Sequence, residues 1–308
     1  MTTSPGKLRP PHALVSIIGA ASALGAPDPG SAGAPAVLQA RPLVRRLRAI
    51  GSSAEWVETL APSAATPAPG STMDVGMEVC ARFARRLADH LAALPAGHFP
   101  LVIGGDHAIA TGTWRGIGRA RGRAPGMVWI AAHLDTHTDA TTHSGNIHGM
   151  PLAALFGLGH AALAGIRGPA LDPARTCVVG ARIWEAEERH LLDSLGVRVF
   201  TMDEIRARGL GAVFCDALTI ARADPEAGFG LSLDLDALDP QAFPAVTCAE
   251  PGGIDPRTLA DTLLGLRACA DFIALEIVEY RPDLDANGRS ADWIAEFATA
   301  ALGPGTAW

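Results

Sequence analysis

Residues 232–240 read Ser232-Leu233-Asp234-Leu235-Asp236-Ala237-Leu238-Asp239-Pro240, and the rest of the chain is organised around this stretch. Its first residues predict a buried strand. Because Asp234 and Asp236 are two residues apart, their carboxylates are expected on the same side of the pleat. Two buried carboxylates repel each other unless a cation or a shared proton lies between them. The pair therefore indicates a metal site, although the turn-like Asp239-Pro240 leaves open a second interpretation, in which the aspartates only cap a turn.

Two further apolar runs end in residues that can bind a metal. Leu101-Val102-Ile103-Gly104-Gly105 leads to Asp106 and His107, and the run that begins at Met127 contains His133 and ends at Asp135. Open α/β sheets build their sites where the carboxyl ends of strands meet. One histidine after a strand more often makes a structural hydrogen bond, but three such strand ends together favour a metal site.

The composition places the chain in a broad class. With 308 residues, 48% hydrophobic and 19% charged, it can bury a large core. The net charge of -7 argues against nucleic acid and anionic membranes as partners. No apolar run reaches the roughly 18 residues of a membrane span, and residues 1–11 lack the apolar core of a signal peptide. The five cysteines are scattered without a CxxC pair, which is typical of a reduced, cytoplasmic protein.

Strands and helices are predicted to alternate along the whole chain. In addition to the strands above, the pattern predicts strands at 13–18, 176–179, 197–200 and 272–278, helices at 37–50 and 73–94, and a surface loop at 61–72. About eight strands alternating with helices predict an α/β fold with a mostly parallel sheet covered by helices. We expect one domain over 1–308, with loose termini at 1–11 and 303–308.

Several stretches occur in an order and spacing that carry a resemblance. They are Gly104-Gly105-Asp106-His107, Ala132-His133-Leu134-Asp135, Ser144-Gly145-Asn146-Ile147-His148-Gly149, Ser232 to Pro240, and Glu276-Ile277-Val278-Glu279. From about Val15 to Pro282 the chain resembles the ureohydrolases, the family of arginases and agmatinases, and its Ser-Gly-Asn-x-His-Gly stretch is closer to the arginase branch. The resemblance implies a three-layer α/β/α sandwich, two manganese ions, a small guanidino-acid substrate and assembly as a homotrimer or homohexamer.

The resemblance also implies a role for each matching residue. The metal ligands would be His107, His133, Asp135, Asp234 and Asp236. A guanidinium carbon is a poor electrophile, and a metal ion supplies the nucleophile by lowering the pKa of a bound water from about 16 to about 7. This nitrogen and oxygen ligand set suits manganese.

The remaining matches would handle the substrate. His148 would return a proton to the leaving amine, because an unperturbed imidazole titrates near neutral pH. Glu279 would bind the guanidinium group. Ser144 and Asn146 match positions that bind the α-carboxylate in arginases, Glu185 would lie near the α-amino group, and His137 stands where arginases commonly have an asparagine.

Two departures suggest a substrate other than arginine itself. One is His137, and the other is the segment Val246-Thr247-Cys248, which replaces a Thr-Gly-Thr-like segment near the pocket. The expected reaction is therefore hydrolysis of arginine or of a derivative such as N-hydroxyarginine, giving urea or a urea derivative and an amine.

Ala131 is the largest departure, because the family has there an aspartate that bridges the two metals. Three interpretations are open. The site is active although altered, with His137 or Asp139 compensating or with one metal sufficing. Alternatively, the chain is a ligand-deficient homologue that binds without hydrolysing, or a non-catalytic subunit. The third interpretation shifts the motif to residues 135–139, which we disfavour because it shortens the loop to His148 by four residues.

Overall fold

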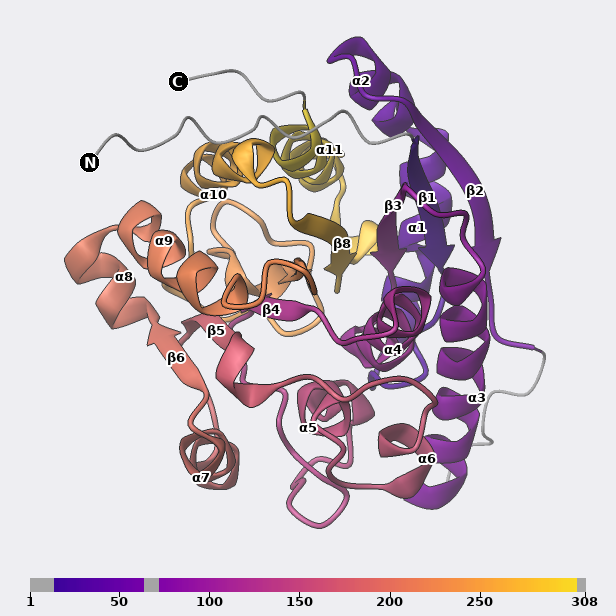
Figure 1. The fold of residues 1–308 in the computed structure, drawn as a ribbon, viewed down its shortest axis with the longest axis vertical. Helices are drawn as coiled ribbons and strands as arrows, with labels where there is room; N and C mark the ends of the chain where they lie inside the picture. The colour runs from indigo at the N-terminus through magenta and orange to yellow at the C-terminus, as the bar shows by residue number, and fades with distance from the viewer. Residues whose placement is uncertain (1–13, 64–71, 304–308) are drawn as a thin grey trace.

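The computed structural model describes residues 14–63 and 72–303. In this part of the chain, one sheet of eight parallel strands has the order β2-β1-β3-β8-β7-β4-β5-β6 (Figure 1). The strands are β1 Leu14–Ala20, β2 Ala54–Leu60, β3 His98–Gly104, β4 Gly126–Ile130, β5 Thr176–Ala181, β6 Arg198–Thr201, β7 Phe229–Asp234 and β8 Phe272–Val278. Because the strands are parallel, their carboxyl ends meet at one edge of the sheet.

Helices cover both faces of the sheet, which confirms the predicted three-layer α/β/α sandwich. The first face carries α1 Ala34–Ala40, α2 Leu43–Ala49, α8 Met202–Arg208, α9 Leu210–Ala221, α10 Pro256–Leu263 and α11 Arg289–Leu302. The second carries α3 Met73–Ala92, α4 Ala110–Arg121, α5 Pro151–Leu155, α6 Ala161–Ala164 and α7 Ala186–Leu195. In Figure 1, α10 and α11 lie above the sheet, and α4 and α5 lie below it.

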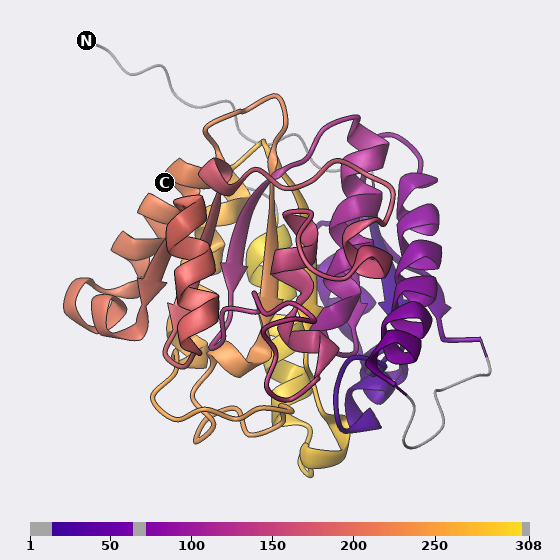
Figure 2. The same cartoon turned by 90° about the horizontal axis from the view of Figure 1, so that it is seen from below.

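The core lies between the sheet and each helical layer. The interior strand β4 is buried along its whole length, as expected for a parallel strand that helices cover on both sides. On the second face, α3 and α4 pack side by side (Figure 2). Glycine permits this close approach, because a Cβ at Gly112 would lie 2.4 Å from the carbonyl oxygen of Ala84.

One local prediction was wrong, and one strand was missed. The helix expected over 37–50 is divided into α1 and α2, because Pro42 restricts the residue before it and Arg41 is extended. No expectation included β2, an edge strand that pairs only with β1 and exposes several of its side chains.

The sequence-based expectation for the two aspartates of residues 232–240 was also wrong. Asp234 ends β7, whereas Asp236 lies in the following 3₁₀ turn, Leu235–Ala237. The two carboxylates therefore do not leave one strand on the same side. Asp234 Oδ1 accepts a hydrogen bond from Asp236 N at 2.9 Å, so Asp234 does cap a turn, while its Oδ2 faces His107.

Some expectations lie wholly or largely outside the described residues, namely the loose termini at 1–11 and 303–308 and the surface loop at 61–72. Among the helices of the described ranges, none combines the length and the apolar content needed to cross a membrane.

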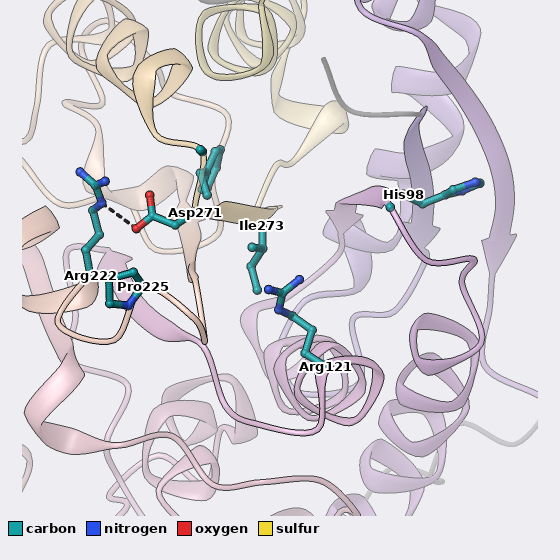
Figure 3. Close-up of a pocket in the computed structure, with 9 residues that line it drawn as sticks. His98, Arg121, Arg222, Pro225, Asp271 and Ile273 are labelled. Atoms are coloured by element: carbon teal, nitrogen blue, oxygen red, sulfur yellow. Dashed lines mark hydrogen bonds and ion pairs between the residues drawn. The ribbon is translucent and has the colours of Figure 1, made fainter. Parts of the chain in front are cut away.

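The edge of the sheet where β3 and β8 begin borders an open pocket of about 530 Å³ (Figure 3). His98 and Phe272, the first residues of these strands, line it together with Arg121. Arg222 forms an ion pair with Asp271 at 2.7 Å at its wall. This pocket lies at the amino ends of the strands, so it is separate from the edge where the predicted site residues gather.

Candidate active site

Three side chains from three strand ends meet at the carboxyl edge of the sheet. His107 follows β3, Asp135 follows β4 and Asp234 ends β7. His107 Nδ1 lies 2.8 Å from Asp234 Oδ2 and 3.1 Å from Asp135 Oδ2, and all three side chains are buried. Two buried carboxylates facing one imidazole form a donor set that suits manganese, and a cation between them would relieve their repulsion. We call these residues the deep cluster.

Neighbouring side chains fix the orientation of the deep cluster. The ring of Trp129 stacks on His107 with 4.1 Å between centroids, and its Nε1 donates to Asp135 Oδ2 at 3.0 Å. The other nitrogen of His107 lies 3.0 Å from the hydroxyl of Ser232, which donates to Glu276 Oε2 at 2.6 Å. Such contacts hold a ligating imidazole in one orientation.

These supporting residues were not assigned a role from the sequence. Ser232 stands two residues before Asp234, so strand alternation alone places both on the same face of β7 and gave a usable signal. The contacts of Trp129 and Glu276 depend on the packing of α4 and three strands, which no local pattern encodes.

A second imidazole and carboxylate lie beside the deep cluster. His133 Nδ1 is 2.6 Å from Asp236 Oδ2, and Asp236 Oδ1 accepts from Ala132 N at 2.8 Å. Burial opposes charge on His133, but Asp236 outweighs it and raises the pKa of the imidazole to about 10. Burial also opposes charge on Asp236, and His133 nevertheless lowers the pKa of that carboxyl. In Asp234 burial dominates, and with the charge of Asp236 it raises the pKa well above its usual value.

His148 and Glu279 form the third part of the site. Glu279 Oε1 lies 3.0 Å from His148 Nδ1 and accepts from the backbone N–H of His107 at 2.8 Å. Burial opposes charge on His148, yet Glu279 raises the pKa of the imidazole to about 9. Glu279 has φ 68 and Asp135 has φ 53, both in the left-handed region that non-glycine residues rarely adopt. Backbone strain of this kind concentrates at functional sites.

Comparison with known proteins identifies the family behind this arrangement. A sequence model described as "Arginase family" matches residues 13–303. The chain belongs to the arginase family. The arginase of Brevibacillus brevis is 36% identical over 284 residues, which cover 90% of this chain and 93% of that protein. The resemblance to the arginase and agmatinase group is thereby confirmed.

Solved structures of arginases extend this similarity to the fold. The arginase of Bacillus caldovelox has a TM-score of 0.88 and 30% identity, covering 95% of this chain and 99% of that one. The arginase of Bacillus cereus has a TM-score of 0.87 and 30% identity, covering 96% and 99% of the two chains. The sheet of this arginase-family chain and the two layers of helices around it are therefore those of the arginase fold.

The substrate residues proposed for the outer end of the site lie on a loop and, for Glu185, directly before α7. His137 Nε2 is in close contact with Glu185 Oε2 and lies 3.6 Å from Glu188 Oε2. Ser144 is exposed and Asn146 is partly exposed, and the serine hydroxyl accepts from the asparagine N–H at 3.2 Å. The structure thus brings His137 and Glu185 together, whereas the contacts of Ser144 and Asn146 stay within their own loop, where Asn146 O accepts from Gly149 N at 3.3 Å.

Ala131 lies directly after β4 in this arginase-family chain. It is fully buried, and strand alternation places its Cβ on the same face as Trp129, whose ring covers His107. Asp139 is exposed, and the imidazole of His137 faces Glu185 and Glu188 rather than the deep cluster. Neither residue therefore occupies the place of a carboxylate at position 131.

Proposed function

We propose that this arginase-family chain hydrolyses the guanidino group of an amino acid such as arginine or N-hydroxyarginine, giving urea or a urea derivative and an amine. The observation that carries the proposal is the buried deep cluster next to the His148–Glu279 pair. One donor set for a metal and one proton-transfer pair are what such a hydrolysis requires.

Manganese is the cofactor that this donor set supports best. His107, Asp135 and Asp234 would hold one ion, and His133, Asp234 and Asp236 would hold a second. Because Ala131 offers no carboxylate between them, we expect the second ion to bind more weakly, so that one ion per chain is the principal state. When bound, the metal supplies a water of lowered pKa as the nucleophile.

The protein's own groups would bind the substrate and move the proton. Glu279 carries a buried carboxylate, and His148 lowers its pKa although burial opposes this, so it remains charged and can hold a guanidinium group through charge-assisted hydrogen bonds. His148, with its raised pKa, is protonated at neutral pH and can give its proton to the leaving amine.

The outer residues would recognise the amino-acid end of the substrate. Glu185 at the start of α7 would bind the α-amino group, while His137, Ser144 and Asn146 on the loop would bind the α-carboxylate. The start of this loop is fixed near the site. His137 N donates to Gly149 O at 3.0 Å, which connects the loop to the segment that carries His148.

The first test is metal content and urea release with manganese supplied, in the natural chain and in Ala131→Asp. We expect about one manganese per chain in the natural protein. The restored carboxylate should raise this toward two and increase hydrolysis by at least about tenfold, the scale on which metal-site partners act. Ala131→Asn is the matched control, because it has nearly the same shape without the charge and should give no gain.

A second candidate is a ligand-deficient homologue that binds guanidino acids without hydrolysing them, and the buried Ala131 favours it. Under this hypothesis the natural chain releases no urea and only Ala131→Asp does. Failure of both proteins, with manganese bound, would contradict the enzyme proposal.

We also propose that residues 1–308 form a single domain that assembles into a homotrimer or homohexamer and acts in the cytoplasm. Sedimentation of the purified chain tests the assembly, since a monomer at micromolar concentration would contradict it.

A further inference from the structure

A second group of imidazoles and carboxylates lies apart from the deep cluster, between the loop after β4 and the first turn of α7. His137, Glu185 and Glu188 each offer a donor atom, and these atoms lie within 4.8 Å of one another. His143 lies next to them, with its Nδ1 3.8 Å from Glu185 Oε1, but it is not among the three residues whose donor atoms all lie this close together. We call these four residues the mouth cluster. The geometry points to a binding site for a zinc-class divalent cation at the mouth cluster.

Two separations in this cluster are close to the edge of a tetrahedral site, whose remaining position water would fill. Zinc bonds of 2.0–2.2 Å to nitrogen and oxygen place neighbouring donors about 3.4 Å apart. His137 Nε2 lies 3.6 Å from Glu188 Oε2, and the His143–Glu185 separation exceeds this value only slightly. His137 and Glu185 are already in direct contact, so a small rotation of the partly exposed Glu185 would admit an ion.

The buried donors of the mouth cluster are held in place from outside. Glu188 is only 4% exposed, and its two oxygens accept from the N–H groups of Thr136 and Glu185 at 3.2 and 3.1 Å. The Nδ1 of His137 lies 3.2 Å from the hydroxyl of Thr141. A carboxylate oxygen with one hydrogen bond keeps a free lone pair, and an imidazole held through one nitrogen presents the other.

The charge of this region also favours a cation. Three carboxylates, those of Glu185, Glu187 and Glu188, lie in the first turn of α7 or directly before it, and they face two imidazoles of the loop. With neutral imidazoles the group is negative.

A bound cation would change what the outer end of the site recognises, and this consequence rests on the proposed function. It would engage Glu185, the carboxylate proposed for the substrate's α-amino group. Zinc should therefore raise KM for α-amino acid substrates while leaving kcat nearly unchanged.

The test is zinc binding by the full chain, first loaded with manganese, in competition with a chromophoric chelator and with metal content measured after gel filtration. We expect the natural chain to hold one more zinc than His137→Asn. Glu185→Gln and His143→Ala should weaken that zinc by at least about tenfold, on the scale of altered metal-site contacts. The side chains of Glu185 and His143 are 48% and 62% exposed, so these variants keep the test valid if His137→Asn does not fold.

His160→Asn is the matched control, because His160 pairs with Asp74 at 3.5 Å on another part of the surface and should leave zinc binding unchanged. Equal zinc content and affinity in all variants would overturn the inference and leave an ordinary ion pair between His137 and Glu185. A third outcome is that the chain binds no manganese and releases no urea, yet still holds more zinc than its His137→Asn variant. That result would support zinc binding at the mouth cluster and would contradict only the proposed function.

Discussion

The deep cluster and the mouth cluster use the same side-chain chemistry but are built differently. The deep cluster draws its three donors from three strand ends that are far apart in sequence, and all three are buried. The mouth cluster takes its donors from one loop and one helical turn, and Glu185 and His143 are exposed. The difference indicates that the deep cluster depends on the whole sheet, whereas the mouth cluster can change with few consequences for the fold.

The supporting contacts differ in the same way. Trp129, Ser232 and Glu276 surround His107 and come from β4, β7 and β8. The mouth cluster is supported by Thr136, Thr141 and the backbone at the start of α7, all local to the cluster. Substitutions in the deep cluster should therefore affect metal binding and hydrolysis together, while those at the mouth should affect substrate choice.

The largest expected effect is that of Asp234→Asn in the deep cluster. Asparagine keeps the oxygen that accepts from Asp236 N, so the turn after β7 should remain, but the ligand charge is lost. We expect manganese affinity and urea release to fall by more than about 100-fold, beyond the cost of losing a supporting contact. Metal analysis and a urea assay measure the two quantities.

Asp193→Asn is the control for this substitution, because Asp193 pairs with Arg189 on the exposed side of α7 and should leave both quantities unchanged. Unaltered manganese binding in Asp234→Asn would show that the deep cluster is not the metal site and would remove the contrast between the two clusters.

A smaller effect is expected for Ser232→Ala, which removes the hydroxyl between His107 and Glu276. Loss of a contact that orients a ligating imidazole typically costs 10- to 100-fold in metal affinity or activity, roughly the range expected here. The measurement is a manganese titration, with Ser194→Ala as control, since that hydroxyl only donates to Leu191 O within α7. If the titration curves of Ser232→Ala and the natural chain coincide, the hydrogen bonds of Ser232 to His107 and Glu276 do not contribute to manganese binding.

The sequence predicted the parallel sheet and its helical layers, because each buried strand is an apolar run and each helix has its own period. It failed where tertiary contacts decide the local structure. The edge strand β2 has exposed residues because it has a neighbour on one side only. Asp236 leaves the strand because Asp234 caps a turn there, a choice that strand alternation cannot reveal.

The candidate site shows the same division. Spacing and order in the chain singled out His107, Asp135 and Asp234, which the structure brings together. The contact of His137 with Glu185 joins segments 48 residues apart, and nothing local to either residue indicates it. The support of His107 by Glu276 depends on the pairing of β7 with β8.

The smallest expected effect concerns stability and pH at the His148–Glu279 pair. The pKa of His148 is raised from 6.5 to about 9 in the folded protein, so its stabilising contribution is complete below about pH 6.5 and is lost as pH rises through 9. The lowered pKa of Glu279 makes its contribution disappear as pH falls below its usual value of 4.5.

Between these limits, His148→Asn should lower the free energy of unfolding of the metal-free chain by about 2 kcal/mol, since one unit of pKa shift corresponds to about 1.4 kcal/mol and neighbouring carboxylates share the interaction. Urea unfolding at pH 7 and pH 10 measures the difference, which should shrink at the higher pH. At pH 7 it should also become smaller when Glu279→Gln is the background, although Asp106 and Asp135 keep part of the interaction. A pH-independent difference would show that His148 stabilises this part of the site by packing rather than through its charge pair with Glu279.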